Sequence, residues 1–140
     1  MTARFEAEPN VGNHFAWMRT RLGLERTYLA WLRTAVSLIG FGFTIVQFFA
    51  RLRDMPSLGG REMRPQEPRD LGLALIATGL GALAIASWQY IWIQNYLWRD
   101  DFKSIAGARS KRLRSPALFA GAMLALIGIA AFVSVFFHFL

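Results

Sequence analysis

Three long runs without a charged residue constrain this chain more than any other feature. The runs cover residues 34–50, 71–98 and 115–140. A bilayer's hydrocarbon core is about 30 Å thick, and a helix needs about 20 apolar residues to cross it. The second and third runs reach that length alone, and the first reaches it when Trp31, Leu32 and the aliphatic stem of Arg33 are included. We therefore predict an all-α integral membrane protein with three transmembrane helices, at roughly 28–50, 71–97 and 116–139.

The composition excludes several other classes of protein. Charged residues make up 18% of the 140 residues and hydrophobic residues 54%, whereas a soluble domain of this size needs a large polar surface. The absence of cysteine excludes a disulfide framework and a thiolate metal site. The sequence also contains neither a phosphate-binding glycine-rich loop nor a His-Glu-x-x-His motif. We therefore expect no enzyme activity, no cofactor and no metal site.

The positions of the basic residues predict the orientation of the chain in the membrane. Five basic residues precede the first run, five separate the first run from the second, six separate the second from the third, and none follows the third. Three spans place the residues before the first run and the residues between the second and third runs on the same side of the membrane. The positive-inside rule therefore predicts an inner N-terminus and an outer C-terminus. Because topology accounts for most of the net charge of +7, we expect contact with the membrane surface and not with nucleic acid.

The segment before the first run predicts a helix at the membrane surface. Between residues 14 and 24, apolar side chains such as Phe15 and Trp17 alternate with basic ones. This pattern is typical of an amphipathic helix in the interface, which we expect to lie on the inner side. Gly23 is the expected elbow because it is the weakest helix former in the stretch. The polar residues 1–13 are expected to form a flexible arm, and residues 14–140 a single transmembrane domain.

One face of the first span carries only small or polar residues. In steps of four and three these are Arg26, Ala30, Arg33, Ser37, Gly40, Thr44 and Gln47. In one interpretation, the small residues let a neighbouring helix approach closely, and the two arginines are boundary anchors. In the other, several copies surround an axis and this face lines a basic passage. We call this face the stripe. Because a single three-helix subunit has few ways to cover it, we expect a symmetric homo-oligomer with the first span nearest the axis.

The depth of the two arginines follows from their distance to the next charge on the same helix. Arg33 precedes Arg51 by 18 residues, which is about 27 Å along a helix. We therefore expect Arg33 at or just inside the inner edge of the hydrocarbon, and Arg26 about two turns closer to the cytosol. Glu25, four residues after Arg21 and next to Arg26, is expected to neutralise part of this basic field.

Two further groups of side chains point to the inner membrane surface. Five aromatic residues at the end of the second run predict a belt at the lipid headgroups: Trp88, Tyr90, Trp92, Tyr96 and Trp98. Four basic residues before the third run are candidates for binding anionic lipid headgroups: Arg109, Lys111, Arg112 and Arg114.

Residues 25–34, with the sequence Glu-Arg-Thr-Tyr-Leu-Ala-Trp-Leu-Arg-Thr, resemble the signature of the YidH-like family of small bacterial inner-membrane proteins, a domain of unknown function. The resemblance continues to Gly42, whereas the second and third spans match by size and order only. The same fold family includes the membrane domain of the vacuolar transporter chaperone complex, which makes polyphosphate and moves it across a membrane. By this resemblance, Arg26 and Arg33 match basic positions of its central path. Glu25 and Thr27 of the signature become candidates for the same anion site.

Three classes of function remain open from the sequence. The first is a homo-oligomeric module that binds or conducts an anion such as phosphate or polyphosphate, for which the planar, bidentate guanidinium is well suited. The second is a structural subunit that binds another membrane protein through the stripe. The third is a protein that binds anionic lipids through its basic cluster.

Overall fold

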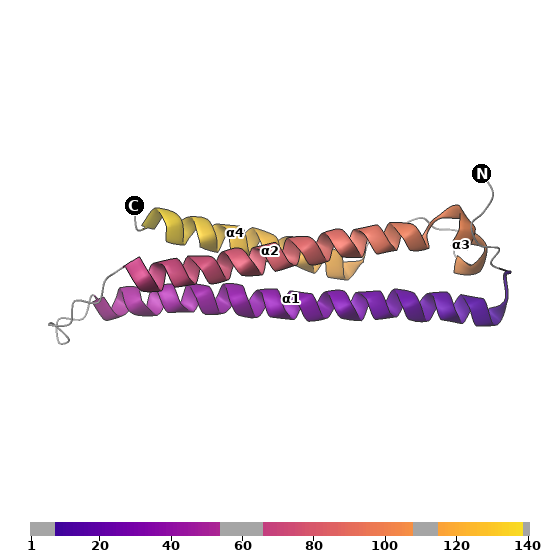
Figure 1. Cartoon of the computed structure of the whole chain (residues 1–140), viewed down its shortest axis with the longest axis horizontal. Helices are drawn as coiled ribbons and strands as arrows, with labels where there is room; N and C mark the ends of the chain where they lie inside the picture. The colour runs from indigo at the N-terminus through magenta and orange to yellow at the C-terminus, as the bar shows by residue number, and fades with distance from the viewer. Residues whose placement is uncertain (1–7, 54–65, 108–114, 139–140) are drawn as a thin grey trace.

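The computed structural model describes residues 8–53, 66–107 and 115–138, and these form four helices. The helices are α1 (Val11–Arg53), α2 (Gln66–Leu97), α3 (Asp100–Ala106) and α4 (Pro116–His138). No strand occurs in the described ranges. The helices α1, α2 and α4 are long and apolar enough to cross a membrane, which confirms the predicted all-α fold with three transmembrane helices. Figure 1 shows α1 and α2 side by side, with α4 along the bundle and α3 near the N-terminal end of α1.

Helix α1 is a single continuous helix of 43 residues, about 65 Å long. It begins at Val11 because the side chain of Asn10 accepts a hydrogen bond from the backbone N–H of Asn13 at 2.7 Å, as an N-cap does. Residues 14–24, which were expected to form a separate interfacial helix, are part of this continuous helix, and the elbow expected at Gly23 is absent. Trp17 is the reason, because it is buried and its indole nitrogen donates to the carbonyl oxygen of Leu97 at 3.1 Å. The N-terminal part of α1 therefore packs on α2 and α3 and continues straight into the rest of the helix.

Helix α3 completes a small core at the end of the bundle where α1 begins. Trp17, Leu97 and Ala106 form one buried cluster. The imidazole Nδ1 of His14 lies 2.7 Å from the carbonyl oxygen of Ile105, next to Gly107, which ends α3 in the left-handed conformation with φ of 63°. A helix after the second span is not among the elements predicted from the sequence. Helix α3 is short because Gly107 ends it after two turns.

Helices α1 and α2 pack closely in antiparallel directions because glycines lie at their contact. A methyl group added at Gly79 would lie 2.8 Å from Cγ1 of Ile39 and 3.1 Å from the carbonyl oxygen of Ala35. Three pairs of contacting residues define the register of the two helices: Trp17 with Leu97, Tyr28 with Ser87, and Gly42 with Gly72. The residue numbers of each pair add up to nearly the same value, so the register holds along the whole contact.

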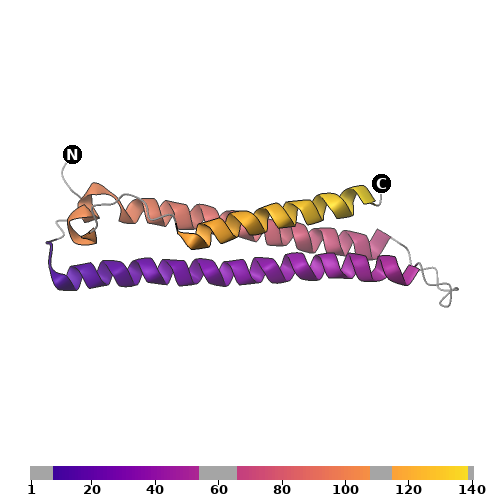
Figure 2. The same ribbon diagram turned by 180° about the vertical axis from the view of Figure 1, so that it is seen from behind.

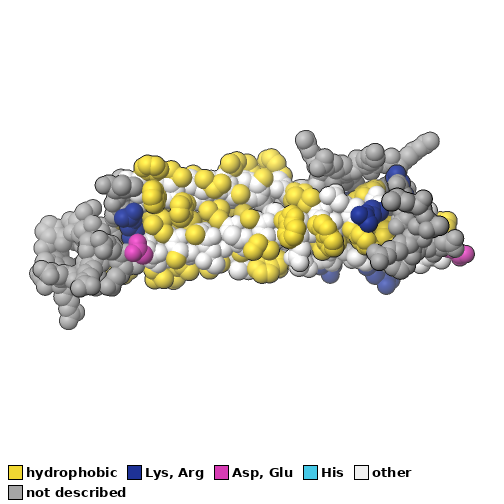
Figure 3. Space-filling view, turned by 45° about the horizontal axis from the view of Figure 1, so that its top comes forward, with side chains coloured by type: hydrophobic (Ala, Val, Ile, Leu, Met, Phe, Trp, Pro, Cys, Tyr) yellow, Lys and Arg dark blue, Asp and Glu magenta, His cyan; other side chains and the backbone are white. Residues whose placement is uncertain are grey.

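Helix α4 covers one side of the α1–α2 contact, as Figures 1 and 2 show from opposite sides. Gly121 lies against the hydroxyl of Tyr28, and a methyl group at Gly128 would lie 2.9 Å from Cδ1 of Ile39. The other side of the contact has no such cover in the described part of the chain. Figure 3 shows that hydrophobic side chains gather over the middle of the bundle and that charged side chains lie nearer its ends.

Candidate functional site on the exposed face of α1

The signature residues 25–34 divide between two faces of α1. Tyr28 and Leu32 are buried, and the Tyr28 ring lies 4.8 Å from the ring of Tyr90 between centroids. The Tyr28 hydroxyl and the hydroxyl of Ser87 are hydrogen-bonded at 2.9 Å. Arg26, Thr27, Ala30 and Arg33 are exposed. The signature therefore carries both the residues that join α1 to α2 and a set of residues with no packing role inside the subunit.

Glu25 belongs to the packing part of the signature. The hydroxyl of Ser115 donates to Oε1 of Glu25 at 3.4 Å, and Ser115 is buried at the start of α4. The backbone N–H of Leu118 donates to the carbonyl oxygen of Ser115, as in a first helical turn. A carboxylate is stabilised at a helix N-terminus by the helix dipole. Glu25 thus forms its hydrogen bond with α4. Among the described residues it forms none with Arg21 or Arg26, whose charge it was expected to neutralise in part.

The link between Glu25 and Ser115 is one that sequence reasoning missed. The two residues are separated by 90 positions. The dipeptide Ser-Pro before an apolar run is a recognisable start signal for a helix. It reveals the capping residue but not the helix that supplies the carboxylate.

All the stripe residues are exposed: Arg26, Ala30, Arg33, Ser37, Gly40, Thr44 and Gln47. A methyl group at Gly40 would meet no atom within 4 Å. The packed face of α1, centred on Ala35 and Ile39, lies roughly 150° around the helix from the stripe. The close helix approach within the subunit therefore uses Gly42, Gly72 and Gly79, and the stripe is left for water or for another chain.

The hydroxyl groups of the exposed face are satisfied within α1. Thr27 donates to the carbonyl oxygen of Gly23, Ser37 to that of Arg33 and Thr44 to that of Gly40, at 2.8 to 3.0 Å. Such bonds let a hydroxyl sit in an apolar environment without a partner on another helix. The groups on this face that still require a partner at membrane depth are the guanidinium groups of Arg26 and Arg33.

The register of α1 and α2 places Arg33 level with Gly81. Gly81 lies in the uncharged run of α2, about 16 Å along the helix from Asp70 and about 16 Å from Trp92. The distance between Asp70 and Trp92 along α2 matches the thickness of a hydrocarbon core. Arg33 is therefore level with the interior of the uncharged run of α2 and not with either end of that run. The reason is that α2 is offset along α1, so that Asp70 is level with Thr44 and not with Arg51.

Arg33 is far from any carboxylate of the described spans. Residues 26–50, 71–97 and 116–137 contain no aspartate or glutamate. The nearest acidic residue along α1 is Glu25, about 12 Å away in helix rise. Glu25 already accepts a hydrogen bond from Ser115. A charge at the membrane centre costs at least ~2.5–3.5 kcal/mol on insertion scales. An exposed guanidinium at this depth thus calls for water or an anion beside it.

The aromatic belt is smaller than predicted. Trp88, Trp92 and Tyr96 are exposed on α2. Tyr90 is instead buried against Tyr28, and Trp98 packs edge-on against Trp17 with ring centroids 5.5 Å apart. The basic cluster at Arg109, Lys111, Arg112 and Arg114 lies outside the described residues.

The fold and this exposed face define a small multi-pass membrane protein whose first helix presents basic and small residues away from its own subunit. The chain belongs to the DUF202 family, a domain of unknown function, whose model matches residues 19–96, more than half of the chain. The matched range includes the signature and the α1–α2 contact, in agreement with the YidH-like resemblance. Neither a curated protein nor a solved structure matches this sequence.

Proposed function

We propose that this protein forms a symmetric homo-oligomer in the bacterial inner membrane, with α1 nearest the axis and the stripe lining a path for an anion such as phosphate or polyphosphate. The N-terminus is cytoplasmic in this proposal. The single observation that carries it is the position of Arg33, which is exposed, level with the interior of the uncharged run of α2, and distant from every carboxylate of the described spans. A water-filled path along the symmetry axis of the oligomer gives this guanidinium both water and an anion.

The charges and side chains along the stripe support an anion over a cation. Arg26 and Arg33 lie on the same face, about 10 Å apart in helix rise. Symmetric copies form two rings of guanidinium groups, and their planar donors match phosphate oxygens. The small residues Ser37, Gly40 and Thr44 continue the face toward the outer side without a bulky side chain. An anion that enters from the cytoplasm therefore meets Arg26 first and Arg33 second.

The experiment is phosphate efflux from liposomes that contain the purified full chain. Arg33→Gln is compared with the parent protein and with Arg51→Gln, which removes an exposed charge at the outer end of α1. We expect Arg33→Gln to lower efflux about tenfold or more and Arg51→Gln to leave it nearly unchanged, with the same oligomer mass for all three. Equal efflux for the three proteins, or efflux no faster than from empty liposomes, contradicts the proposal.

The second candidate is a structural subunit that seats a helix of another membrane protein on the stripe. The open space over Gly40 favours it, because small residues without a neighbour are typical of helix-pairing faces. In that case the chain co-purifies with its partner, and Gly40→Leu releases the partner.

A further inference from the structure

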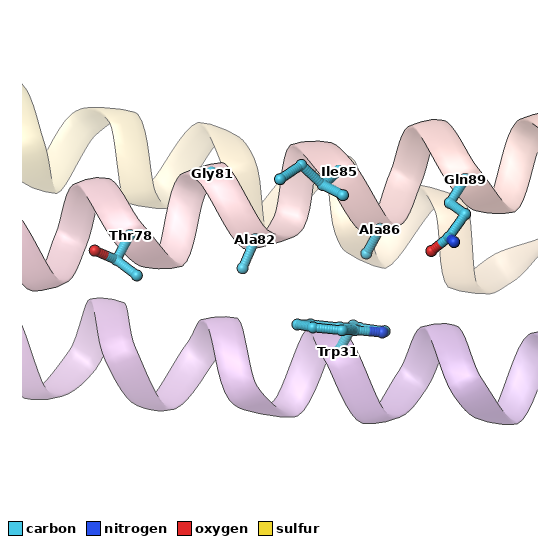
Figure 4. A pocket seen from close by; sticks show the side chains of 7 residues that line it. All are labelled: Trp31, Thr78, Gly81, Ala82, Ile85, Ala86 and Gln89. Atoms are coloured by element: carbon cyan, nitrogen blue, oxygen red, sulfur yellow. The ribbon is translucent and has the colours of Figure 1, made fainter.

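A hollow of about 400 Å³ lies between α1 and α2 on the side that α4 does not cover. Its lining comes from Trp31 of α1 and from Thr78, Gly81, Ala82, Ile85, Ala86 and Gln89 of α2. Figure 4 shows the Trp31 ring flat between the two helices, with the side chains of Ala82 and Ala86 directed toward α1. The stripe and Trp31 lie on opposite sides of α1, so a second copy that covers the stripe leaves this hollow open to lipid.

The two ends of the hollow differ in polarity. Thr78, at the outer end, donates its hydroxyl to the carbonyl oxygen of Ala74 at 2.7 Å and so offers no free donor. At the inner end, Figure 4 shows the amide of Gln89 directed toward α1, on the side where the indole nitrogen of Trp31 lies. Neither group has a hydrogen-bond partner among the described residues. The hollow therefore has an apolar floor and two polar groups at its cytoplasmic mouth.

The depth of the hollow matches one leaflet of the bilayer. Gln89 lies about 12 Å along α2 from Gly81, in the direction of the exposed Trp92. The inner half of the hydrocarbon core is about 15 Å thick. An acyl chain of the inner leaflet thus fits between Thr78 and Gln89, with its ester oxygens at the depth of the two polar groups.

The same face of α2 continues to a basic residue at headgroup depth. Helical steps of three and four lead from Ile85 and Gln89 to Trp92 and Tyr96, whose rings stack with centroids 6.4 Å apart. The guanidinium of Arg99 lies over the Tyr96 ring, 5.9 Å from its centroid. The rings leave the guanidinium exposed at the membrane surface, where it can meet a phosphate group.

We infer that this face is a binding site for an anionic phospholipid of the inner leaflet. One acyl chain fills the hollow beside Trp31, the ester carbonyls accept hydrogen bonds from Gln89 and Trp31, and the headgroup phosphate pairs with Arg99. The site is separate from the stripe and does not depend on anion conduction. Its residues also differ from the cluster at residues 109–114 that the sequence suggested for lipids.

Native mass spectrometry of the full chain in mild detergent tests the site, with phosphatidylglycerol and phosphatidylcholine added as probes. Ala82→Leu fills the hollow, whereas Ala84→Leu adds the same group to an exposed position of α2 outside it. We expect Ala82→Leu to lower retained phosphatidylglycerol about tenfold and Ala84→Leu to leave it unchanged. We expect Arg99→Gln to remove the preference for phosphatidylglycerol over phosphatidylcholine, and Arg51→Gln to keep that preference.

Three outcomes overturn the inference. The first is equal lipid retention by Ala82→Leu and Ala84→Leu. The second is a loss of oligomer mass in Ala82→Leu with lipid retention unchanged, which assigns the hollow to a second copy. The third is an unchanged headgroup preference in Arg99→Gln. If Ala82→Leu does not fold, Gly81→Leu replaces it, because a side chain added at Gly81 meets no atom within 4 Å.

Discussion

Gly42 of α1 and Gly72 of α2 face each other so closely that neither position accepts a methyl group without movement. A Cβ at Gly42 would lie 2.7 Å from the carbonyl oxygen of Gly72, and a Cβ at Gly72 would lie 2.8 Å from that of Gly42. This contact holds the register of the two helices. The register in turn places Arg33 level with Gly81, inside the uncharged run of α2.

The first prediction tests this contact with a matched pair of substitutions. Gly42→Ala is expected to lower stability by about 1–3 kcal/mol, because the added methyl group must push two backbones apart. Gly40→Ala, two residues earlier, meets open space and is expected to be neutral or slightly stabilising. Thermal unfolding in detergent measures both. A smaller loss for Gly42→Ala than for Gly40→Ala contradicts the register.

The second prediction concerns the hydrogen bond between Tyr28 and Ser87. Tyr28→Phe removes a hydroxyl that lies 2.9 Å from its partner, and such bonds between membrane helices contribute about 0.6 kcal/mol on average. Tyr28→Phe, Ser87→Ala and the double variant are compared by unfolding in detergent. We expect the double variant to lose no more stability than Tyr28→Phe alone. Fully additive losses contradict a direct bond.

The third prediction concerns assembly through the stripe. Gly40→Leu is expected to weaken the oligomer, because a branched side chain on an exposed small-residue face keeps a second helix at a distance. Ala84→Leu serves as the control on an exposed face of α2. The mass of each protein in mild detergent and in lipid is the measurement. A parent protein that is monomeric in both media refutes the predicted homo-oligomer.

The fourth prediction separates Arg26 from Arg33 by their depths. Arg26 is level with Trp88, where an ammonium group reaches the headgroups, so Arg26→Lys is expected to change anion efflux less than twofold. Arg33→Lys is expected to lower efflux more, because one ammonium does not reproduce the bidentate geometry of a guanidinium. Arg33→Glu is expected to abolish efflux while the oligomer mass stays the same. If lysine replaces both arginines equally well, they serve only as anchors.

The fifth prediction concerns orientation. The basic residues before residue 34 and between residues 99 and 114 outnumber those between residues 51 and 70 by eleven to five, so a reporter fused after Leu140 is expected to be active only on the outer side. A fusion between residues 57 and 58 is expected to report the same side, and a fusion at the N-terminus the inner side. Inner activity of the Leu140 fusion contradicts the predicted topology.

The sequence by itself determined the number of spans, the helical class and the members of the stripe. These follow from the length of uncharged runs and from helical periodicity, and both are local properties of the chain. The stripe was predicted residue by residue, because a face without large apolar side chains is visible once positions are taken in steps of four and three. The packing partners of Tyr28 and Glu25 were not predictable in this way, since Ser87 and Ser115 lie 59 and 90 positions further along.

Only the tertiary structure decided the level of Arg33 relative to α2 and which residues of α1 are covered by other helices. Arg33 appeared to mark the membrane edge while α1 was considered alone, because the next charge on the same helix, Arg51, lies one membrane thickness away. The offset between the helices places Arg33 level with Gly81 in the uncharged run of α2, and the contact of Gly42 with Gly72 belongs to that offset. The elbow expected at Gly23 is likewise absent because Trp17 donates a hydrogen bond to the carbonyl oxygen of Leu97. Intrinsic helix propensity is weak compared with such packing, which forms between residues far apart in the sequence.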